Sequence, residues 1–197
     1  MSRRLEFWFE FASTYSYPAA MRVEREARAA SVEVAWRPFL LGPIFKTQGW
    51  NDSPFNLYPV KGAYMWRDLE RTCDSLGLVF RRPSRFPRNG LLAARVATAG
   101  RDEPWLGDFV RAVYQANFGA DREIAERETI AAILGELGLP ADDLLAAADS
   151  AETKEKLRAA TEEATRRGVF GAPTFFVGDE LFWGNDRLEH AIAWARR

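Results

Sequence analysis

The chain has 197 residues, of which 47% are hydrophobic and 28% charged, and its formal net charge is −1. This length and composition are typical of one ordinary globular protein that buries a sizeable core. The nearly neutral charge argues against a nucleic-acid partner, which would require a clearly basic face. No hydrophobic run is long enough to cross a membrane, so no membrane partner is expected either.

The chain contains one cysteine, Cys73, and one histidine, His190. One cysteine cannot form an internal disulfide, which favours a reducing, cytoplasmic setting. Residues 1–4 lead directly into a predicted strand, so we expect no signal peptide. A single histidine excludes a histidine-rich metal site and argues against a Ser-His hydrolase, so we expect no bound metal.

The segment Leu5–Tyr17 combines a strand pattern with a polar turn. Hydrophobic residues alternate from Leu5 to Phe11, which predicts a strand with one strongly apolar face. Ser13 and Ser16 follow in a turn that leads into a helix predicted over 19–30. Such a turn presents backbone N–H groups and the positive end of a helix to a ligand. We therefore expect the chemistry here, with helix capping as the alternative role of Ser13.

The rest of the chain predicts helices followed by a terminal hairpin. A second strand over 32–36 completes a βαβ unit with parallel strands. The segment 42–58 is rich in Gly, Pro, Asn and aromatic residues and is predicted to be an irregular loop. Two strands around Gly178-Asp179 form a hairpin, and a last helix follows. Helical patterns lie between the loop and the hairpin, over 63–76, 90–99, 105–117, 127–137, 141–150 and 152–167.

The order βαβ, helical insertion, ββα predicts an α/β, thioredoxin-like fold with a large all-helical insertion. The thioredoxin-like domain is discontinuous and comprises residues 1–40 and 168–197, whereas the insertion domain comprises 41–167. A Pro173-Thr174 pair stands just ahead of the first strand of the hairpin. Thioredoxin-like proteins place a cis-proline at this point, facing the helix start.

Several separated segments occur in the order found in one known family: Phe9–Tyr17, Pro59–Tyr64, Phe86–Asn89, Gly168–Val177 and Phe182–Arg187. On these segments the whole chain resembles the 2-hydroxychromene-2-carboxylate isomerases and, more distantly, the kappa-class glutathione transferases. Both belong to the DsbA-like branch of the thioredoxin superfamily. The chain departs from the family at Thr14, which replaces a usual proline, and at Pro18, where relatives often carry an aliphatic residue.

The resemblance implies a glutathione site around Ser13. This serine takes the position that binds the glutathione sulfur, where a hydroxyl and a helix start would favour the thiolate. A cis Ala172–Pro173 bond would turn the backbone N–H and C=O of Ala172 toward the tripeptide, which pairs with them as an added strand does. Ser16 is expected to support the turn.

The remaining implied glutathione contacts lie in two distant segments. Asn185 and Asp186 match the pair that holds the γ-glutamyl end, with Asp186 accepting from its ammonium group. Lys61 matches a basic residue that pairs with a glutathione carboxylate, and Asn56 is a further candidate in the same region. Arg88 and Asn89 are not part of this set, and the sequence leaves open whether they contact substrate or only shape a loop.

The activity implied by the resemblance is a glutathione-dependent isomerisation. It interconverts 2-hydroxychromene-2-carboxylate and trans-o-hydroxybenzylidenepyruvate, in aromatic hydrocarbon catabolism, or acts on a related aromatic 2-oxo acid. Glutathione would be a recycled nucleophilic catalyst, the aromatic-rich loop 39–58 would help line the substrate pocket, and the protein would be a homodimer. Two alternatives stay open: a kappa-like transferase or peroxidase that consumes glutathione, and a non-catalytic glutathione- or peptide-binding module.

Overall fold

The computed structural model describes residues 3–197. Its four strands form one mixed sheet in the order β2-β1-β3-β4. The strands are β1 (Arg4–Phe9), β2 (Glu33–Pro38), β3 (Thr174–Val177) and β4 (Glu180–Trp183). β1 is parallel to β2 and antiparallel to β3, and β3 pairs antiparallel with β4. The predicted βαβ unit and the terminal hairpin are confirmed.

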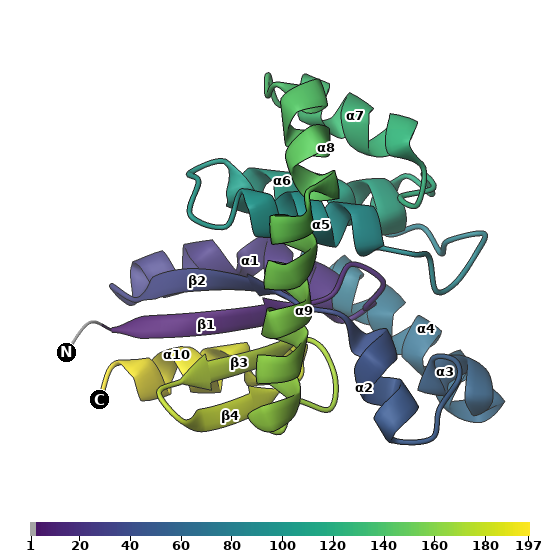
Figure 1. Ribbon diagram of the computed structural model, residues 1–197. Coiled ribbons are helices and arrows are strands. Elements are labelled where there is room, and N and C mark those ends of the chain that lie inside the picture. The colour runs from purple at the N-terminus through teal and green to yellow at the C-terminus, as the bar shows by residue number, and fades with distance from the viewer. Residues whose placement is uncertain (1–2) are drawn as a thin grey trace.

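Helices cover both faces of this sheet. α1 (Ser16–Ala29) and α10 (Leu188–Ala195) pack on one face, and α9 (Ala151–Arg166) crosses the other (Figure 1). The other elements between β2 and β3 are α2 (Leu41–Thr47), α3 (Pro54–Leu57), α4 (Pro59–Ser75), α5 (Leu91–Ala99), α6 (Leu106–Tyr114), the π-helix η1 (Gln115–Gly119), α7 (Arg127–Glu136) and α8 (Ala141–Asp149). A 3₁₀ turn, η2 (Asn185–Arg187), joins β4 to α10. The thioredoxin-like fold with a large helical insertion is therefore confirmed.

The central strand β1 is buried on both of its faces. Phe7 and Phe9 belong to a large core with α1, α10 and the helices at the top of Figure 1. Trp8 points the other way, into a second cluster that contains Phe39 and Phe176 and lies against α9. The predicted apolar face is confirmed, and the burial of Trp8 on the opposite face, which the pattern did not predict, places β1 between two hydrophobic layers.

Two short helices replace most of the irregular loop predicted over 42–58. Pro43 lies in the first turn of α2, and Pro54 is the first residue of α3. A proline in the first turn of a helix costs little, because the N–H that it lacks would have no helical partner. The side chain of Ser53 also accepts the N–H of Phe55 and caps α3. The prolines that suggested a loop here mark helix starts.

The first helix begins three residues earlier than the predicted start at residue 19. α1 starts at Ser16, and Pro18 lies in its first turn. The polar turn that contains Ser13 is therefore outside the helix and precedes its N-terminus. Within residues 3–197, no helix combines the length and the hydrophobicity needed to span a bilayer.

Candidate functional site

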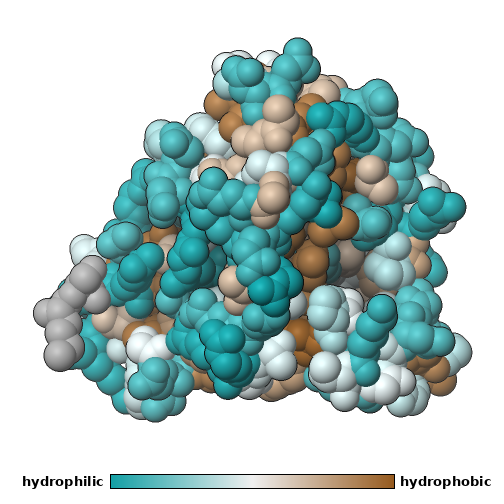
Figure 2. Space-filling view, viewed as in Figure 1, coloured by the Kyte–Doolittle hydropathy of each residue, from teal (hydrophilic) through white to brown (hydrophobic). Residues whose placement is uncertain are grey.

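A cavity of about 1450 Å³ lies between the β1–α1 turn, helices α2 to α4 and the segments that flank the hairpin. Most of the predicted site residues line it: Ser13, Lys61, Ala172, Asn185 and Asp186. Much of the remaining wall is aromatic or aliphatic and includes Leu40, Leu41, Phe45, Trp50, Phe55, Phe86, Phe170 and Trp183. The face of the molecule in Figure 2 is mostly hydrophilic, and hydrophobic surface gathers on it to the right of α9.

A tight turn presents Ser13 to this cavity. Its N–H donates to the backbone carbonyl of Glu10 at 2.9 Å, which closes the turn. Its hydroxyl donates to the Ala172 carbonyl at 2.9 Å and accepts the N–H of Ser16, the first residue of α1, at 3.3 Å. Ser13 therefore both supports the helix start and lines the cavity. A ligand atom that accepts from the hydroxyl takes the place of the Ala172 carbonyl.

The Ala172–Pro173 peptide bond is cis, as the resemblance implies. The backbone of Ala172 offers its carbonyl to Ser13, and its N–H has no hydrogen-bond partner among residues 3–197. Pro173 is buried and does not line the cavity, and its carbonyl accepts the N–H of Gly184 at 2.9 Å. Ala172 thus supplies the backbone edge that faces the cavity.

Arg22, which the sequence analysis did not identify, fixes the orientation of Asn185. Arg22 is buried in α1 and donates to the side-chain oxygen of Asn185 from Nε at 3.3 Å and from Nη2 at 3.1 Å. It also pairs with Glu189 of α10. Because the oxygen of Asn185 is occupied, its NH₂ group is left to donate to a ligand. Asp186 is exposed, and its carboxylate lies 3.3 Å from the guanidinium of Arg187.

Lys61 and Asn56 differ in what they offer the cavity. Lys61 lies in the first turn of α4 with its ammonium 5.8 Å from the centre of the Phe55 ring, and it has no ion-pair partner within residues 3–197. Asn56 does not line the cavity. Its amide donates to the carboxylate of Asp52 at 3.1 Å and to the carbonyl of Phe86 at 3.2 Å. Asn56 therefore braces α3 against the neighbouring segment.

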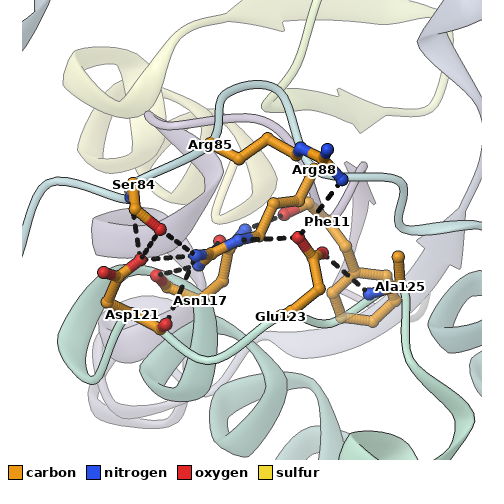
Figure 3. A network of polar contacts seen from close by, with 8 residues as sticks. All are labelled: Phe11, Ser84, Arg85, Arg88, Asn117, Asp121, Glu123 and Ala125. Carbon is orange, nitrogen blue, oxygen red and sulfur yellow. Dashed lines mark hydrogen bonds and ion pairs between the residues drawn. The ribbon is translucent and has the colours of Figure 1, made fainter.

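Arg88 is the centre of a buried polar network (Figure 3). Its guanidinium donates to the backbone and side-chain oxygens of Asn117, each at 3.2 Å, and to Asp121, and it lies 3.5 Å from Glu123. Asn117, in the π-helix η1, donates in turn to the carbonyl of Phe11 at 3.1 Å. The network thus ties the wall of the cavity to the turn that carries Ser13. These contacts give Arg88 a structural role.

Asn89 and Asp121, which lie next to Arg88, also make hydrogen bonds to neighbouring backbone N–H groups. The side-chain oxygen of Asn89 accepts the N–H of Leu91, the first residue of α5, at 2.9 Å. The backbone N–H of Ser84 and the Arg88 guanidinium lower the pKa of Asp121 to about 2. A second cis peptide, Phe86–Pro87, precedes Arg88, and the sequence analysis did not foresee it.

Glu10 is a buried carboxyl in the wall of the cavity. Burial raises its pKa to about 7, although the N–H of Ala12, 3.1 Å from Oε2, acts in the opposite direction. The sequence analysis treated Glu10 only as part of the strand pattern. The available signal was an acidic residue that ends a hydrophobic strand three positions before the candidate serine.

Residues 4–191 match the DSBA-like thioredoxin domain. The chain belongs to the DSBA-like thioredoxin family. It is 32% identical to the 2-hydroxychromene-2-carboxylate isomerase of Sphingobium xenophagum over 96% of both chains. It is 26% identical to glutathione S-transferase kappa 2 of Caenorhabditis elegans, over 93% of this chain and 88% of that protein.

A solved structure of a 2-hydroxychromene-2-carboxylate isomerase superposes on this member of the family with a TM-score of 0.86. The sequence identity is 26%, and the match covers 97% of this chain and 93% of the other. These relatives are named as isomerases and glutathione transferases, which supports an enzymatic role for the chain. Cys73 is the only cysteine of the chain, so the turn that contains Ser13 and Ser16 carries no thiol of its own.

Proposed function

We propose that this protein is a glutathione-dependent isomerase that interconverts 2-hydroxychromene-2-carboxylate and trans-o-hydroxybenzylidenepyruvate, or acts on a related aromatic 2-oxo acid. One observation carries the proposal. A single cavity of about 1450 Å³ is lined both by a polar group for each part of glutathione and by aromatic and aliphatic side chains that suit an aromatic ring. The isomerase relatives support the reaction class.

Each part of the glutathione tripeptide has a polar partner on the cavity wall. Ser13 takes the sulfur, and the N–H and C=O of Ala172 pair with the cysteinyl backbone as a neighbouring strand would. The NH₂ of Asn185 donates to the γ-glutamyl carboxylate, and Asp186 accepts from the adjacent ammonium. Lys61 pairs with the glycyl carboxylate.

The chain's own residues hold the sulfur and the substrate in position. Bound glutathione would supply a thiolate nucleophile for reversible addition to the conjugated double bond of the substrate, held in place by these residues. The hydroxyl of Ser13 and the N-terminus of α1 stabilise the negative charge on sulfur. The hydrophobic wall excludes water, which strengthens these interactions.

An aromatic pair beside Ala172 provides a surface for the substrate ring. Phe170 and Trp183 are 45% and 49% exposed, and their ring centroids lie 4.9 Å apart. A Cβ at Gly171 would lie 2.5 Å from Nε1 of Trp183, so the absence of a side chain there lets the indole lie against the backbone. Aromatic rings stack on such a surface with offset or edge-on geometry.

The kappa-class relatives favour a second candidate function, in which the same site activates glutathione for transfer to an electrophile or for peroxide reduction. The two functions differ in stoichiometry. An isomerase returns the thiol after each turnover, whereas a transferase or peroxidase consumes it.

The test is an isomerisation assay with a thiol count. Purified protein is mixed with the chromene substrate and with glutathione or S-methylglutathione. We expect interconversion of the substrate only with glutathione. Glutathione should suffice in amounts far below those of the substrate, and the concentration of free thiol should stay constant. Loss of thiol in step with product would support the transferase, and absence of glutathione binding at millimolar concentration would contradict both. The Ser13→Ala variant loses rate in either case.

The proposal extends to the setting of the enzyme. We expect it to act as a homodimer in the cytoplasm, as the resemblance implies. Light scattering of the purified protein measures its mass in solution, and a mass of one chain at all concentrations would contradict the dimer.

A further inference from the structure

The carboxyl of Glu10 lies in the same β-turn as Ser13, and both side chains line the cavity. Glu10 is only 8% exposed. Its Oε2 accepts the N–H of Ala12, whereas Oε1 has no hydrogen-bond partner among residues 3–197. A Cβ at Gly90 would lie 2.7 Å from Cβ of Phe11 and 3.3 Å from Oε1 of Glu10, so this glycine makes room for Phe11 and for the carboxyl.

Within residues 3–197, no counter-ion pairs with the buried carboxyl of Glu10. Tyr114 of α6 faces it, but its hydroxyl donates to the backbone carbonyl of Glu10 at 2.8 Å and not to the carboxyl. Arg88 lines the same cavity, but its guanidinium is held in the network of Figure 3. The other charged groups on the cavity wall are Lys46, Asp52, Lys61, Asp68 and Asp186. Only burial and the Ala12 N–H shift the pKa of Glu10.

We propose that Glu10 takes up the thiol proton when glutathione binds at Ser13 and keeps it while the sulfur is a thiolate. This inference rests on the proposed function. The S–H bond breaks and an O–H bond forms on the Glu10 carboxylate, so that one negative charge moves from oxygen to sulfur and no oxidant or reductant is needed. Two negative charges in one water-poor cavity repel each other. The Glu10 carboxyl and the glutathione sulfur together therefore carry one negative charge in each state.

The proton count on binding distinguishes this role from a structural one. Glutathione is titrated into the protein by calorimetry at pH 8, in two buffers with different ionisation enthalpies. For a free thiol with a pKa of about 8.5, binding as a thiolate with no internal acceptor releases about three quarters of a proton. We expect the wild type to release close to zero protons on binding glutathione. Glu10→Gln should either release protons on binding or bind glutathione without the thiolate absorbance. The matched control is Glu103→Gln, an exposed residue outside the cavity, which behaves as the wild type.

A second measurement uses only the wild-type protein, so it does not depend on the folding of a variant. The pH titration of the Glu10 carboxyl carbon is followed by ¹³C NMR in three samples: the free protein, the protein with glutathione and the protein with S-methylglutathione. We expect its pKa to rise by one unit or more with glutathione and not with S-methylglutathione, which carries no thiol proton. Equal proton release from wild type and Glu10→Gln, with an unmoved pKa, would overturn the role of Glu10 and leave the glutathione site intact. Failure of glutathione to bind would overturn both.

Discussion

Arg88 and Glu10 are both buried charged groups at the wall of one cavity, yet their surroundings differ completely. The guanidinium of Arg88 contacts Asn117, Asp121 and Glu123. The carboxyl of Glu10 accepts one backbone N–H. A buried charge is costly unless it is paired. The paired Arg88 therefore holds the cavity wall in place, whereas the unpaired carboxyl of Glu10 gains or loses its proton easily. Unpaired buried titratable groups in a cavity are typical of functional sites.

Removal of Arg88 should give the largest loss of stability. We expect Arg88→Met to lower the free energy of unfolding by about 4 kcal/mol, because it leaves Asp121, Glu123 and the buried Asn117 without their partner. Urea unfolding measures this. The matched control is Arg85→Met, since the side chain of Arg85 is 78% exposed and 4.0 Å from Glu123; it should change stability by less than about 0.5 kcal/mol. Equal effects would contradict the structural role of the network.

Replacement of Glu10 by a neutral residue should instead raise the stability of the protein. Its pKa is raised by burial to about 7 in the folded protein, so the folded state binds the proton more tightly than the unfolded state. Its stabilising contribution is full below pH of about 4.5 and is lost as the pH rises through 7. Glu10→Gln should therefore be more stable than wild type by up to about 3 kcal/mol at pH 8.5, with a much smaller difference at pH 5. A difference that does not vary with pH would contradict an unpaired carboxyl.

Arg22 is a third buried charged group. It pairs with Glu189 and donates hydrogen bonds to Asn185, which lines the cavity. We expect Arg22→Met to weaken binding of glutathione and of S-methylglutathione alike by about tenfold, because Asn185 loses the contact that aims its NH₂ group. Calorimetry with both ligands measures this. Arg25→Met is the control, since the side chain of Arg25 is 73% exposed and pairs with Glu26. A folded Arg22→Met protein with unchanged affinity would contradict the positioning role.

Much of the fold follows from local patterns in the sequence. Alternation predicts β1 and β2, and Gly178-Asp179 predicts the hairpin turn. Other features depend on tertiary contacts that no local pattern contains. The burial of Trp8 results from α9, which lies more than 140 residues away in sequence. Helices α2 and α3 were hidden because proline at a helix start and proline in a loop look alike.

The candidate site divides in the same way. The resemblance identified residues that would touch a ligand, such as Ser13, Ala172 and Asn185, and the structure brings them to one cavity. The groups that orient or poise them, Arg22 and Glu10, were missed. A single arginine in a helix or a glutamate at a strand end carries no motif, and its meaning comes from burial and from the partners that the fold provides.

The most direct test of the account is the pH titration of the ultraviolet thiolate absorbance of bound glutathione in wild type and in Ser13→Ala. The account places the sulfur at Ser13, where the hydroxyl and the N-terminus of α1 stabilise negative charge. We predict a midpoint below pH 7 for the wild-type complex, against about 8.5 for a free thiol, and a shift upward by one unit or more in Ser13→Ala. A wild-type midpoint equal to that of free glutathione, or one that Ser13→Ala leaves unchanged, would contradict the account.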